Sequence, residues 1–218
     1  ISWLRNTHHG YEAELYTDLG NDVVNTKQTF NLASLSFESQ EMLSLSVSHH
    51  TDRPNKDFDI SDGTVIPAGN YDWWDARLSL NTGLYRKFAT ANSYTVGSFY
   101  DGQRQQLSST LVYRPTNRIS LRLDYSLNLI DWKQFKDSTI NLISGSIQYS
   151  FTSDLTLFNL IQYDDISNSI GVNSRLQWEY KPGAKMFFVL NQGYVDEMTG
   201  FVIKDLEVVA KIGGMFRF

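Results

Sequence analysis

Apolar and polar residues alternate at every second position through most of this chain. The clearest interior stretch is 119–129, where Ile, Leu and Tyr at odd positions alternate with Ser, Arg, Asp and Asn at even positions. In the last stretch, 205–218, apolar or small residues from Leu206 to Phe218 alternate with a more polar set. A period of two is that of a β-strand with one apolar and one polar face. The pattern therefore predicts an all-β chain.

The alternation predicts about 12 strands, most of them near the length with which a tilted strand crosses a bilayer. They span about 3–16, 28–38, 43–50, 74–81, 94–100, 107–113, 119–129, 143–151, 155–163, 172–180, 185–194 and 205–218. Between Leu32 and Ala33 the alternation changes phase, which predicts a β-bulge. Asp101-Gly102 predicts a tight hairpin. The stretch 51–72, which holds two Pro and five Asp, predicts an irregular loop.

The predicted connections fall into two sets of different length. Short turns are predicted at 39–41, 115–117, 152–154 and 181–184, and longer loops alternate with them, at 51–72, 131–137, 164–170 and 195–204. Transmembrane β-barrels have short periplasmic turns and longer outer loops. Over residues 1–218 we therefore expect a transmembrane antiparallel β-barrel of about 12 strands, with both termini in the periplasm.

Charge separates between the same two sets of connections. All predicted outer connections together hold 14 Asp and Glu against 7 Lys and Arg, whereas the short set holds 2 against 5. Crowded acids at a barrel rim attract cations, and the predicted rim acids are Asp52, Asp57, Asp59 and Asp62. The alternatives are that these acids are simply solvated, or that they bridge through divalent ions to neighbouring lipopolysaccharide.

Composition excludes several classes of protein. No apolar run reaches the roughly 18 residues of a transmembrane helix. Aromatic residues make up 14% of the chain, and such residues favour strands and membrane interfaces. Cysteine is absent, which excludes disulfides and thiolate metal sites. The net charge of −5 argues against nucleic acid as a partner. The chain begins at Ile1 with no signal sequence, so we expect a processed chain or part of a longer one.

The final stretch ends on aromatic residues, Phe216 and Phe218. An amphipathic strand that closes the chain on Phe resembles the last strand of bacterial outer-membrane β-barrels. In those proteins the barrel assembly machinery reads this segment. The resemblance implies that machinery as a partner, Phe216 and Phe218 as the assembly signal, and an outer-membrane location among lipid and lipopolysaccharide.

Longer stretches resemble the family catalogued as domain of unknown function 5916. They are VIPAGNYDWWDARLSL at 65–80, GSFYDGQRQQLS at 97–108, LVYRPTNRISLRLDYS at 111–126, NSRLQWEYKPGAKMFFVLNQG at 173–193 and the terminal MFRF. Members of this family are outer-membrane proteins in which a domain similar to family-9 carbohydrate-binding modules precedes a barrel. The resemblance implies the carboxy-terminal barrel of a longer protein, and it implies no reaction.

Few residues suggest catalysis. His49 and His50 lie beside Asp52 at a strand end, where a His–Asp pair could form a hydrolytic site at the barrel rim. A solvated loop explains the same residues, because one neighbouring His–Asp pair is common by chance. The Asp residues of 51–72 lack the spacing of an EF-hand calcium loop. We therefore expect no enzyme activity, no cofactor and no resident metal.

Alternation also assigns side chains to a lipid side and a lumen side. The apolar positions predicted to face lipid are Leu121, Leu123, Tyr125, Leu127, Leu176, Trp178, Val208 and Ile212. The charged positions predicted to face the lumen are Arg77, Arg122, Asp124, Arg175, Glu179, Glu207 and Lys211. Trp73 and Trp74 fit an interfacial aromatic belt better than a sugar-stacking platform. Lumen charges of mixed sign fit a packed interior and a water-filled pore equally well.

Two classes of function agree with these patterns. One is a pore or conduit for small solutes, with glycans suggested by the family's sugar-binding-like domain. The other is a structural barrel that anchors a periplasmic domain or partner at the outer membrane. A hydrolase at the rim is a more distant alternative. Conductance in planar bilayers separates the first two classes.

Overall fold

The computed structural model describes residues 2–61, 64–83, 85–197 and 200–214, which form fourteen β-strands. The strands are β1 (Leu4–Thr17), β2 (Val23–Phe37), β3 (Met42–Asp52), β4 (Phe58–Ser61), β5 (Thr64–Ile66), β6 (Tyr71–Asn81), β7 (Phe88–Phe99), β8 (Gly102–Thr116), β9 (Ile119–Asp131), β10 (Ser138–Ser150), β11 (Leu155–Asp164), β12 (Ser169–Lys181), β13 (Ala184–Glu197) and β14 (Gly200–Gly214). Among the described residues, no helix is long and apolar enough to span a membrane.

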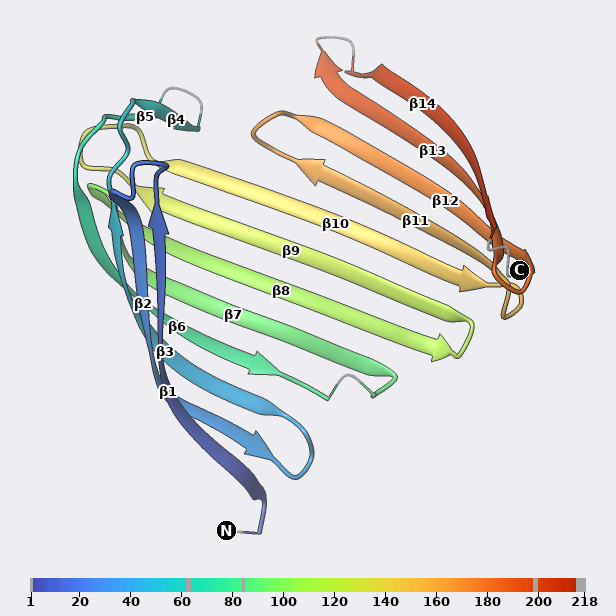
Figure 1. Ribbon diagram of the computed structural model, residues 1–218, viewed down its shortest axis with the longest axis horizontal. Coiled ribbons are helices and arrows are strands. Elements are labelled where there is room, and N and C mark those ends of the chain that lie inside the picture. Colours follow the sequence, from blue (N-terminus) through green and yellow to red (C-terminus); the bar gives the residue numbers. More distant parts are fainter. Residues whose placement is uncertain (1, 62–63, 84, 198–199, 215–218) are drawn as a thin grey trace. The chain divides into compact units, whose positions relative to one another are not determined.

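Twelve strands form one sheet, in the order β1-β2-β3-β6-β7-β8-β9-β10-β11-β12-β13-β14 (Figure 1). The strands β4 and β5 lie between β3 and β6 in the chain and form a separate two-stranded sheet. Strand pairs across the large sheet are antiparallel, from β1–β2 to β13–β14. The predicted all-β class, the antiparallel arrangement and the number of about 12 sheet strands are confirmed.

The chain divides into two compact units. Unit 1 consists of Ile1–Leu84, Thr90–Ser109 and Ser126–Ile140, and unit 2 consists of Tyr85–Ala89, Thr110–Tyr125 and Asn141–Phe218. The unit boundaries fall within β7, β8, β9 and β10, so each of these strands contributes to both units.

In unit 1, the β3–β6 pair shows how alternation separates polar from apolar side chains. Leu45 and Leu78 pair on one face and are 40% and 49% exposed. Ser48 and Asp75 pair on the other face, which we call the polar face, and are 6% and 8% exposed. The apolar face is therefore the exposed one, the reverse of a soluble sheet. This is the polarity of a transmembrane β-barrel sheet, whose apolar residues face lipid.

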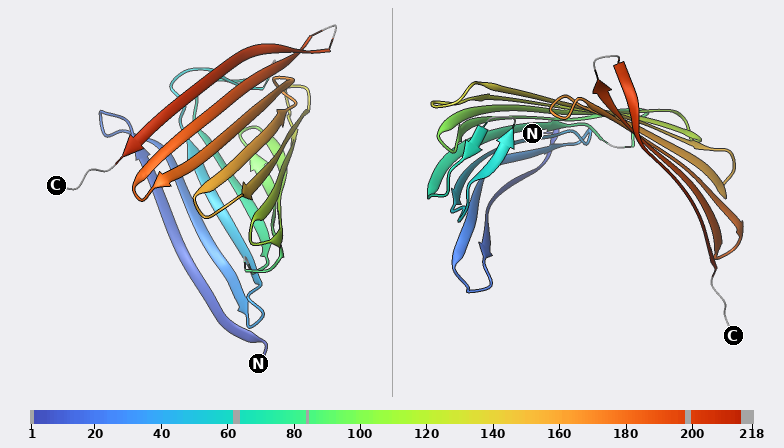
Figure 2. Two further views of the ribbon diagram at one scale, coloured as in Figure 1. Left: turned by 90° about the vertical axis from the view of Figure 1, so that its right-hand side faces the viewer. Right: turned by 90° about the horizontal axis from the view of Figure 1, so that it is seen from above.

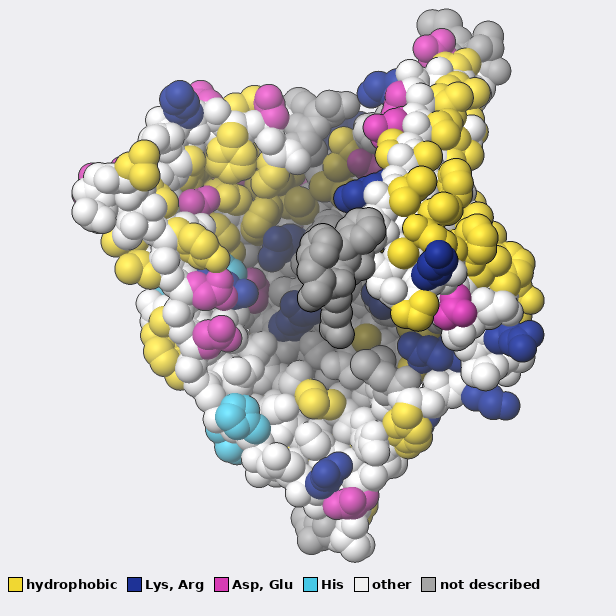
Figure 3. All heavy atoms as spheres, turned by 45° about the vertical axis from the view of Figure 1, so that its right-hand side comes forward, with side chains coloured by type: hydrophobic (Ala, Val, Ile, Leu, Met, Phe, Trp, Pro, Cys, Tyr) yellow, Lys and Arg dark blue, Asp and Glu magenta, His cyan; other side chains and the backbone are white. Residues whose placement is uncertain are grey.

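Unit 2 has the same polarity. Val208 and Ile212 on β14 are 73% and 68% exposed, and Trp178 on β12 is 46% exposed. Hydrophobic side chains gather over β13 and β14 in the space-filling view (Figure 3). The neighbouring positions on the same strands, such as Arg175 and Glu207, form the polar face of unit 2.

The predicted β-bulge is confirmed, and it lies at Leu32. Asn31 pairs with Gly10 and Ser46, but the pairing of β2 shifts with respect to both neighbouring strands immediately after it. His9 Nδ1 lies 2.5 Å from the carbonyl oxygen of Leu32. The extra residue explains why the alternation changes phase at this point of the sequence.

The hairpin between β7 and β8 is tight, as predicted, but it turns one residue earlier than Asp101-Gly102. Its loop residues are Tyr100 and Asp101, and Tyr100 has a positive φ of 51°. Gly102 already belongs to β8. A Cβ at this glycine would approach the carbonyl oxygen of Asp131 to 2.5 Å. The glycine is therefore needed for the close approach of two backbones rather than for the turn.

The prediction of an irregular loop over 51–72 is wrong. β3 continues to Asp52, β6 begins at Tyr71, and the β4–β5 hairpin lies between them. Strands of four and three residues are too short to produce a recognisable alternation. Figure 2 shows this hairpin at the strand ends of unit 1 from two further directions.

The last predicted loop, 195–204, is also wrong in its extent, because β13 continues to Glu197 and β14 begins at Gly200. With the strands extended, 53–70 is the one long connection between the described strands of the large sheet. The predicted alternation is also found at 132–137, which is longer than 117–118 and 151–154, but not at 165–168 or 198–199, which are no longer than the turn that precedes each of them. The predicted assembly signal, Phe216 and Phe218, lies outside the described residues.

Candidate solute-facing surface

Three side chains form a charged layer on the polar face of unit 1, near the β4–β5 hairpin. Asp75 on β6 is 8% exposed. Its Oδ2 lies 2.9 Å from Nε2 of His50 on β3 and 3.7 Å from an Nη of Arg104 on β8. A carboxylate taken out of water needs such partners, because an isolated buried charge is costly. We call His50, Asp75 and Arg104 the charged layer.

Aromatic rings cover the charged layer. Trp73 stacks on His50, with ring centroids 5.2 Å apart and planes inclined by 6°. The Arg104 guanidinium lies 4.3 Å from the centroid of Phe99, a cation–π contact. Trp73 is 7% exposed, and its Nε1 has no hydrogen-bond partner in the described part of the chain. The predicted aromatic belt is therefore wrong for Trp73, whereas Trp74 is 48% exposed and lies on the apolar face.

The predicted hydrolytic site is not assembled. His49 and His50 are neighbours in β3, so their side chains lie on opposite faces of the sheet. Nε2 of His49 lies 2.7 Å from Oδ2 of Asp72, on the apolar face. Asp52 instead accepts a hydrogen bond of 2.6 Å from the Tyr100 hydroxyl. Because each group has a different partner, no His–Asp52 pair forms.

The contact with Asp52 also affects the ionisation of Tyr100, which lies in the turn after β7. Burial and the hydrogen bond to the Asp52 carboxylate raise the pKa of the Tyr100 phenol well above its usual value. The hydroxyl therefore remains a hydrogen-bond donor throughout the physiological pH range.

The predicted rim acids do not form one group. Asp52 is half-buried and bound by Tyr100, and Asp57 accepts a hydrogen bond of 2.8 Å from the backbone amide of Ala68. Asp59 on β4 is exposed, and Asp62 lies outside the described residues. Within the described ranges, no group of three or more His, Cys, Asp or Glu residues could hold a metal ion.

Away from the hairpin, small hydroxyl side chains line the polar face of unit 1. One continuous row of four serines crosses β2, β3, β6 and β7, namely Ser34, Ser44, Ser79 and Ser93. The predicted lumen residue Arg77 lies on the same face and donates a hydrogen bond of 2.9 Å to Ser93. This part of the surface is polar with short side chains.

The polar face of unit 2 carries a ladder of amide and carboxylate side chains. Asn173 donates from Nδ2 to Oδ1 of Asn191 at 2.5 Å, and Asn191 donates from Nδ2 to Oε2 of Glu207 at 2.8 Å. Beside the ladder, the Asp205 carboxylate lies over Gly193, where an added Cβ would come within 1.9 Å of Oδ1. Asn173, Asn191 and Asp205 line a depression of about 380 Å³.

Two cations share the polar face with this ladder, Arg175 on the adjacent row and Lys211 on the row after it. Arg175 is opposite Phe158, and its guanidinium lies 5.6 Å from the centroid of that ring. Lys211 is opposite Phe187. Among the described residues, neither cation has a carboxylate within ion-pair distance.

Other predicted lumen residues of unit 2 are paired. An Nη of Arg122 lies 2.6 Å from Oδ1 of Asp124, which also accepts a hydrogen bond from Thr110. Nζ of Lys185 lies 3.3 Å from Oε2 of Glu179. These are exposed pairs, which contribute little to stability.

Alternation thus locates the predicted lumen residues on the polar faces of their units, while their role remains a prediction. It did not single out Asn173, Asn191, Tyr100 or Arg104. The ladder depends on the register between strands, which a single sequence does not reveal. Arg104 lies within the polar run 103–106, where both faces are polar and the alternation has no phase.

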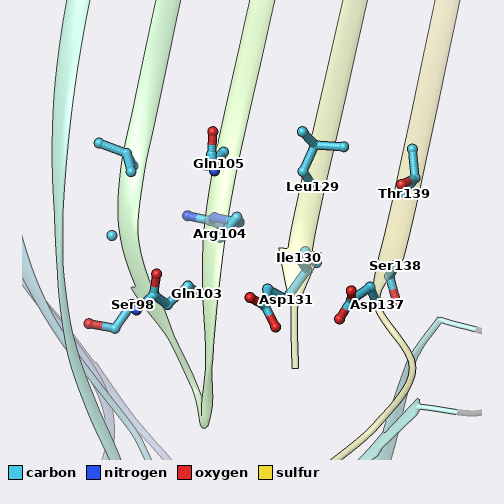
Figure 4. Close-up of a pocket in the computed structure, with 12 residues that line it drawn as sticks. Ser98, Gln103, Arg104, Gln105, Leu129, Ile130, Asp131, Asp137, Ser138 and Thr139 are labelled. Atoms are coloured by element: carbon cyan, nitrogen blue, oxygen red, sulfur yellow. The ribbon is translucent and has the colours of Figure 1, made fainter. Parts of the chain in front are cut away.

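On the apolar face of unit 1, a depression of about 420 Å³ lies between β7, β8, β9 and β10 (Figure 4). Gln103 and Gln105 lie on the same face of β8 as Leu107, and Asp131 lies on the same face of β9 as Leu129. Figure 4 shows the carboxylates of Asp131 and Asp137 at the same end of this depression. Here the apolar face becomes polar, which marks the end of its apolar band.

No family model matches the chain, and no curated protein matches it. Among solved structures, the chain is similar to the KdgM porin in complex with disordered oligogalacturonate (13% identity, TM-score 0.36, covering 97% of this chain and 98% of that chain). It is also similar to the NanC porin (11%, 0.38, 98% and 100%) and to the P. putida toluene transporter TodX (10%, 0.35, 97% and 79%). These likenesses are too weak to carry a conclusion about function.

Proposed function

We propose that this chain forms an outer-membrane β-barrel that conducts small polar solutes. The observation that carries the proposal is the inverted polarity of the sheet, with exposed apolar residues on one face and charged residues on the other. Exposed side chains such as Val208 and Ile212 would each cost free energy in water, at roughly 25 cal/mol per Å² of apolar surface. Lipid removes that cost.

A β-sheet in a membrane also needs hydrogen-bond partners for the backbone groups of its edge strands. The strands β1 and β14 end the order of the sheet. An unpaired strand edge in lipid leaves backbone groups without partners, at a cost of several kcal/mol for each group. A closed sheet has no such edge, which supports the proposal of a barrel. The long connection, 53–70, fits the outer side of the membrane.

The polar face favours a water-filled conduit over a packed interior. A packed interior would pair its charges, because unpaired buried ions are costly. Arg175 and Lys211 have no described carboxylate partner, and Glu207 is exposed. The ladder from Asn173 to Glu207 offers amide and carboxylate groups that suit hydroxyl-rich solutes. Glycans, which the family resemblance suggests, are solutes of this kind.

The test is conductance of the purified protein in planar bilayers. We expect stepwise current increments, and liposomes containing the protein should swell in solutions of small sugars. Protein that inserts and resists proteolysis but gives no current and no swelling would contradict the conduit and favour a barrel that only anchors a partner.

A further inference from the structure

The β4–β5 hairpin has a hydrophobic core of its own in unit 1. Ile66 on β5 is 1% exposed and packs with Ile130 and Trp132, which are 5% and 4% exposed. Phe58 and Ile60 from β4 pack against the same core. A solvated outer loop would leave these apolar side chains in water, so the hairpin is a packed element.

The strand residues beneath the hairpin belong to the polar face. Tyr71 lies two residues before Trp73 on β6, Phe99 two residues after Gly97 on β7, and Ile130 two residues after Asn128 on β9. Side chains two residues apart in a strand share a face. Tyr71, Phe99 and Ile130 belong to the same core as Ile66 of the hairpin, so the hairpin packs on the polar side of the sheet.

Hydrogen bonds hold both ends of the hairpin. The Tyr71 hydroxyl donates to the carbonyl oxygen of Pro67 at 2.8 Å. The amide of Ala68 donates to Asp57 at 2.8 Å, and the amide of Gly69 donates to the carbonyl oxygen of Pro54 at 3.2 Å. The segments that lead into and out of the hairpin are therefore hydrogen-bonded to each other.

We propose that the β4–β5 hairpin is a fixed cap over the solute-facing surface at this end of unit 1, and that it limits the size of the solutes that enter. The inference rests on the proposed conduit. A cap held by Ile66 remains in place because its release would expose Ile66, Ile130 and Trp132 to water. It narrows the entrance by its volume, and pore width decides which solutes pass.

The first experiment removes the cap. Deleting 57–68 and joining Lys56 to Gly69 through two glycines retains the Pro54–Gly69 contact. We expect single-channel conductance to rise about twofold or more, and larger oligosaccharides to enter liposomes that carry the variant. Heat-modifiable mobility in gels confirms that the variant is folded.

The second experiment measures packing without any current. In the unaltered protein, amide exchange at Thr64–Ile66 should be slow. Ile66→Ser should accelerate it roughly 100-fold, because a buried side chain is lost. The matched control is Val65→Ser, since Val65 is 39% exposed on the same short strand and should leave exchange unchanged.

Slow exchange with wider permeation after the deletion supports the cap. Fast exchange at Thr64–Ile66 in the unaltered protein overturns it, as does conductance that the deletion leaves unchanged. If neither the unaltered protein nor the deletion variant conducts, the proposed conduit fails and the size-limiting role fails with it. Fast exchange, or conductance that the deletion leaves unchanged, would overturn the cap without contradicting the conduit. Failure of the cap can therefore be distinguished from failure of the conduit.

Discussion

The polar faces of the two units carry similar residues in different surroundings. In unit 1, Asp75 is 8% exposed, lies within 4 Å of two basic groups and is covered by aromatic rings. In unit 2, Glu207 is exposed and accepts a hydrogen bond from one amide, and Arg175 makes a cation–π contact with Phe158 but has no described carboxylate partner. The rings of Trp73 and Phe99 over the charged layer account for the difference, and Phe99 packs against the core that contains Ile66 of the hairpin.

This difference separates charges that stabilise the fold from charges available to a solute. Where water is excluded, a charge keeps its partners, since the cost of separating them is high. Where water remains, the same ion pair contributes at most about 1 kcal/mol. We therefore expect substitutions in the charged layer to change stability, and substitutions on the unit 2 face to change permeation.

The largest effect is expected for Asp75→Ala. It leaves Arg104 and His50 beneath the aromatic rings without their carboxylate, which should cost about 3–5 kcal/mol of the free energy of unfolding. The measurement is urea unfolding in detergent micelles or liposomes. Glu207→Ala is the matched variant in unit 2, and its cost should stay within about 1 kcal/mol. Equal losses for the two variants would contradict the comparison.

A second prediction tests which face of the unit 2 strands is exposed to water and which to lipid. Leu176 pairs with Leu157 and Phe188 on the apolar face, whereas its neighbour Gln177 lies on the polar face. Leu176→Arg should cost about 2–4 kcal/mol if the position is near the bilayer midplane, and Gln177→Arg should cost much less. Unfolding from liposomes gives both values. A greater loss for Gln177→Arg would reverse the assignment of the faces.

The sequence predicts regular strands far better than it predicts the hairpin end of unit 1. Strand β9 could be predicted because its apolar and polar residues alternate without a break over 119–129. The bulge at Leu32 was visible as a change of phase. In these elements the signal is local, because one face of the strand meets an apolar environment and the other does not.

The packed hairpin and the two polar surfaces depend on contacts between distant residues. Ile66 packs with Ile130 and Trp132, and nothing near Ile66 in the sequence indicates that contact. The acids of 51–72 predicted an open, charged loop, yet Asp52 is bound by Tyr100. Register and loop packing are set by the whole fold, so single-sequence patterns do not determine them.

Tyr100→Phe should have a smaller effect than the first two changes. It removes a hydrogen bond to the Asp52 carboxylate, which we expect to cost about 1–2 kcal/mol of unfolding free energy. Tyr194→Phe is the control in unit 2, where the hydroxyl donates only a long bond of 3.3 Å to Gln192.

The raised pKa of Tyr100 gives this prediction a pH dependence. A group whose folded pKa is raised stabilises the fold fully below its unfolded pKa, near 10 for tyrosine, and less as pH rises toward the folded value. The advantage of the unaltered protein over Tyr100→Phe should therefore be constant from neutral pH to about 10 and decline above it. A decline that begins below pH 9 would show that another group is responsible.

The smallest expected effect concerns ion selectivity on the unit 2 face. Asp205 and Glu207 are exposed near the depression beside the amide ladder, so they raise the local concentration of cations in a conduit. Replacing both with Asn and Gln should move the reversal potential across a salt gradient by a few millivolts toward anion preference. Salt screens exposed charges over about 8 Å at physiological ionic strength, so the shift should be larger in dilute buffer. Asp52→Asn is the comparison in unit 1, where the carboxylate is held by Tyr100, and it should shift the potential less. A larger shift from Asp52→Asn would mean that the hairpin end of unit 1, rather than the open face of unit 2, sets the selectivity.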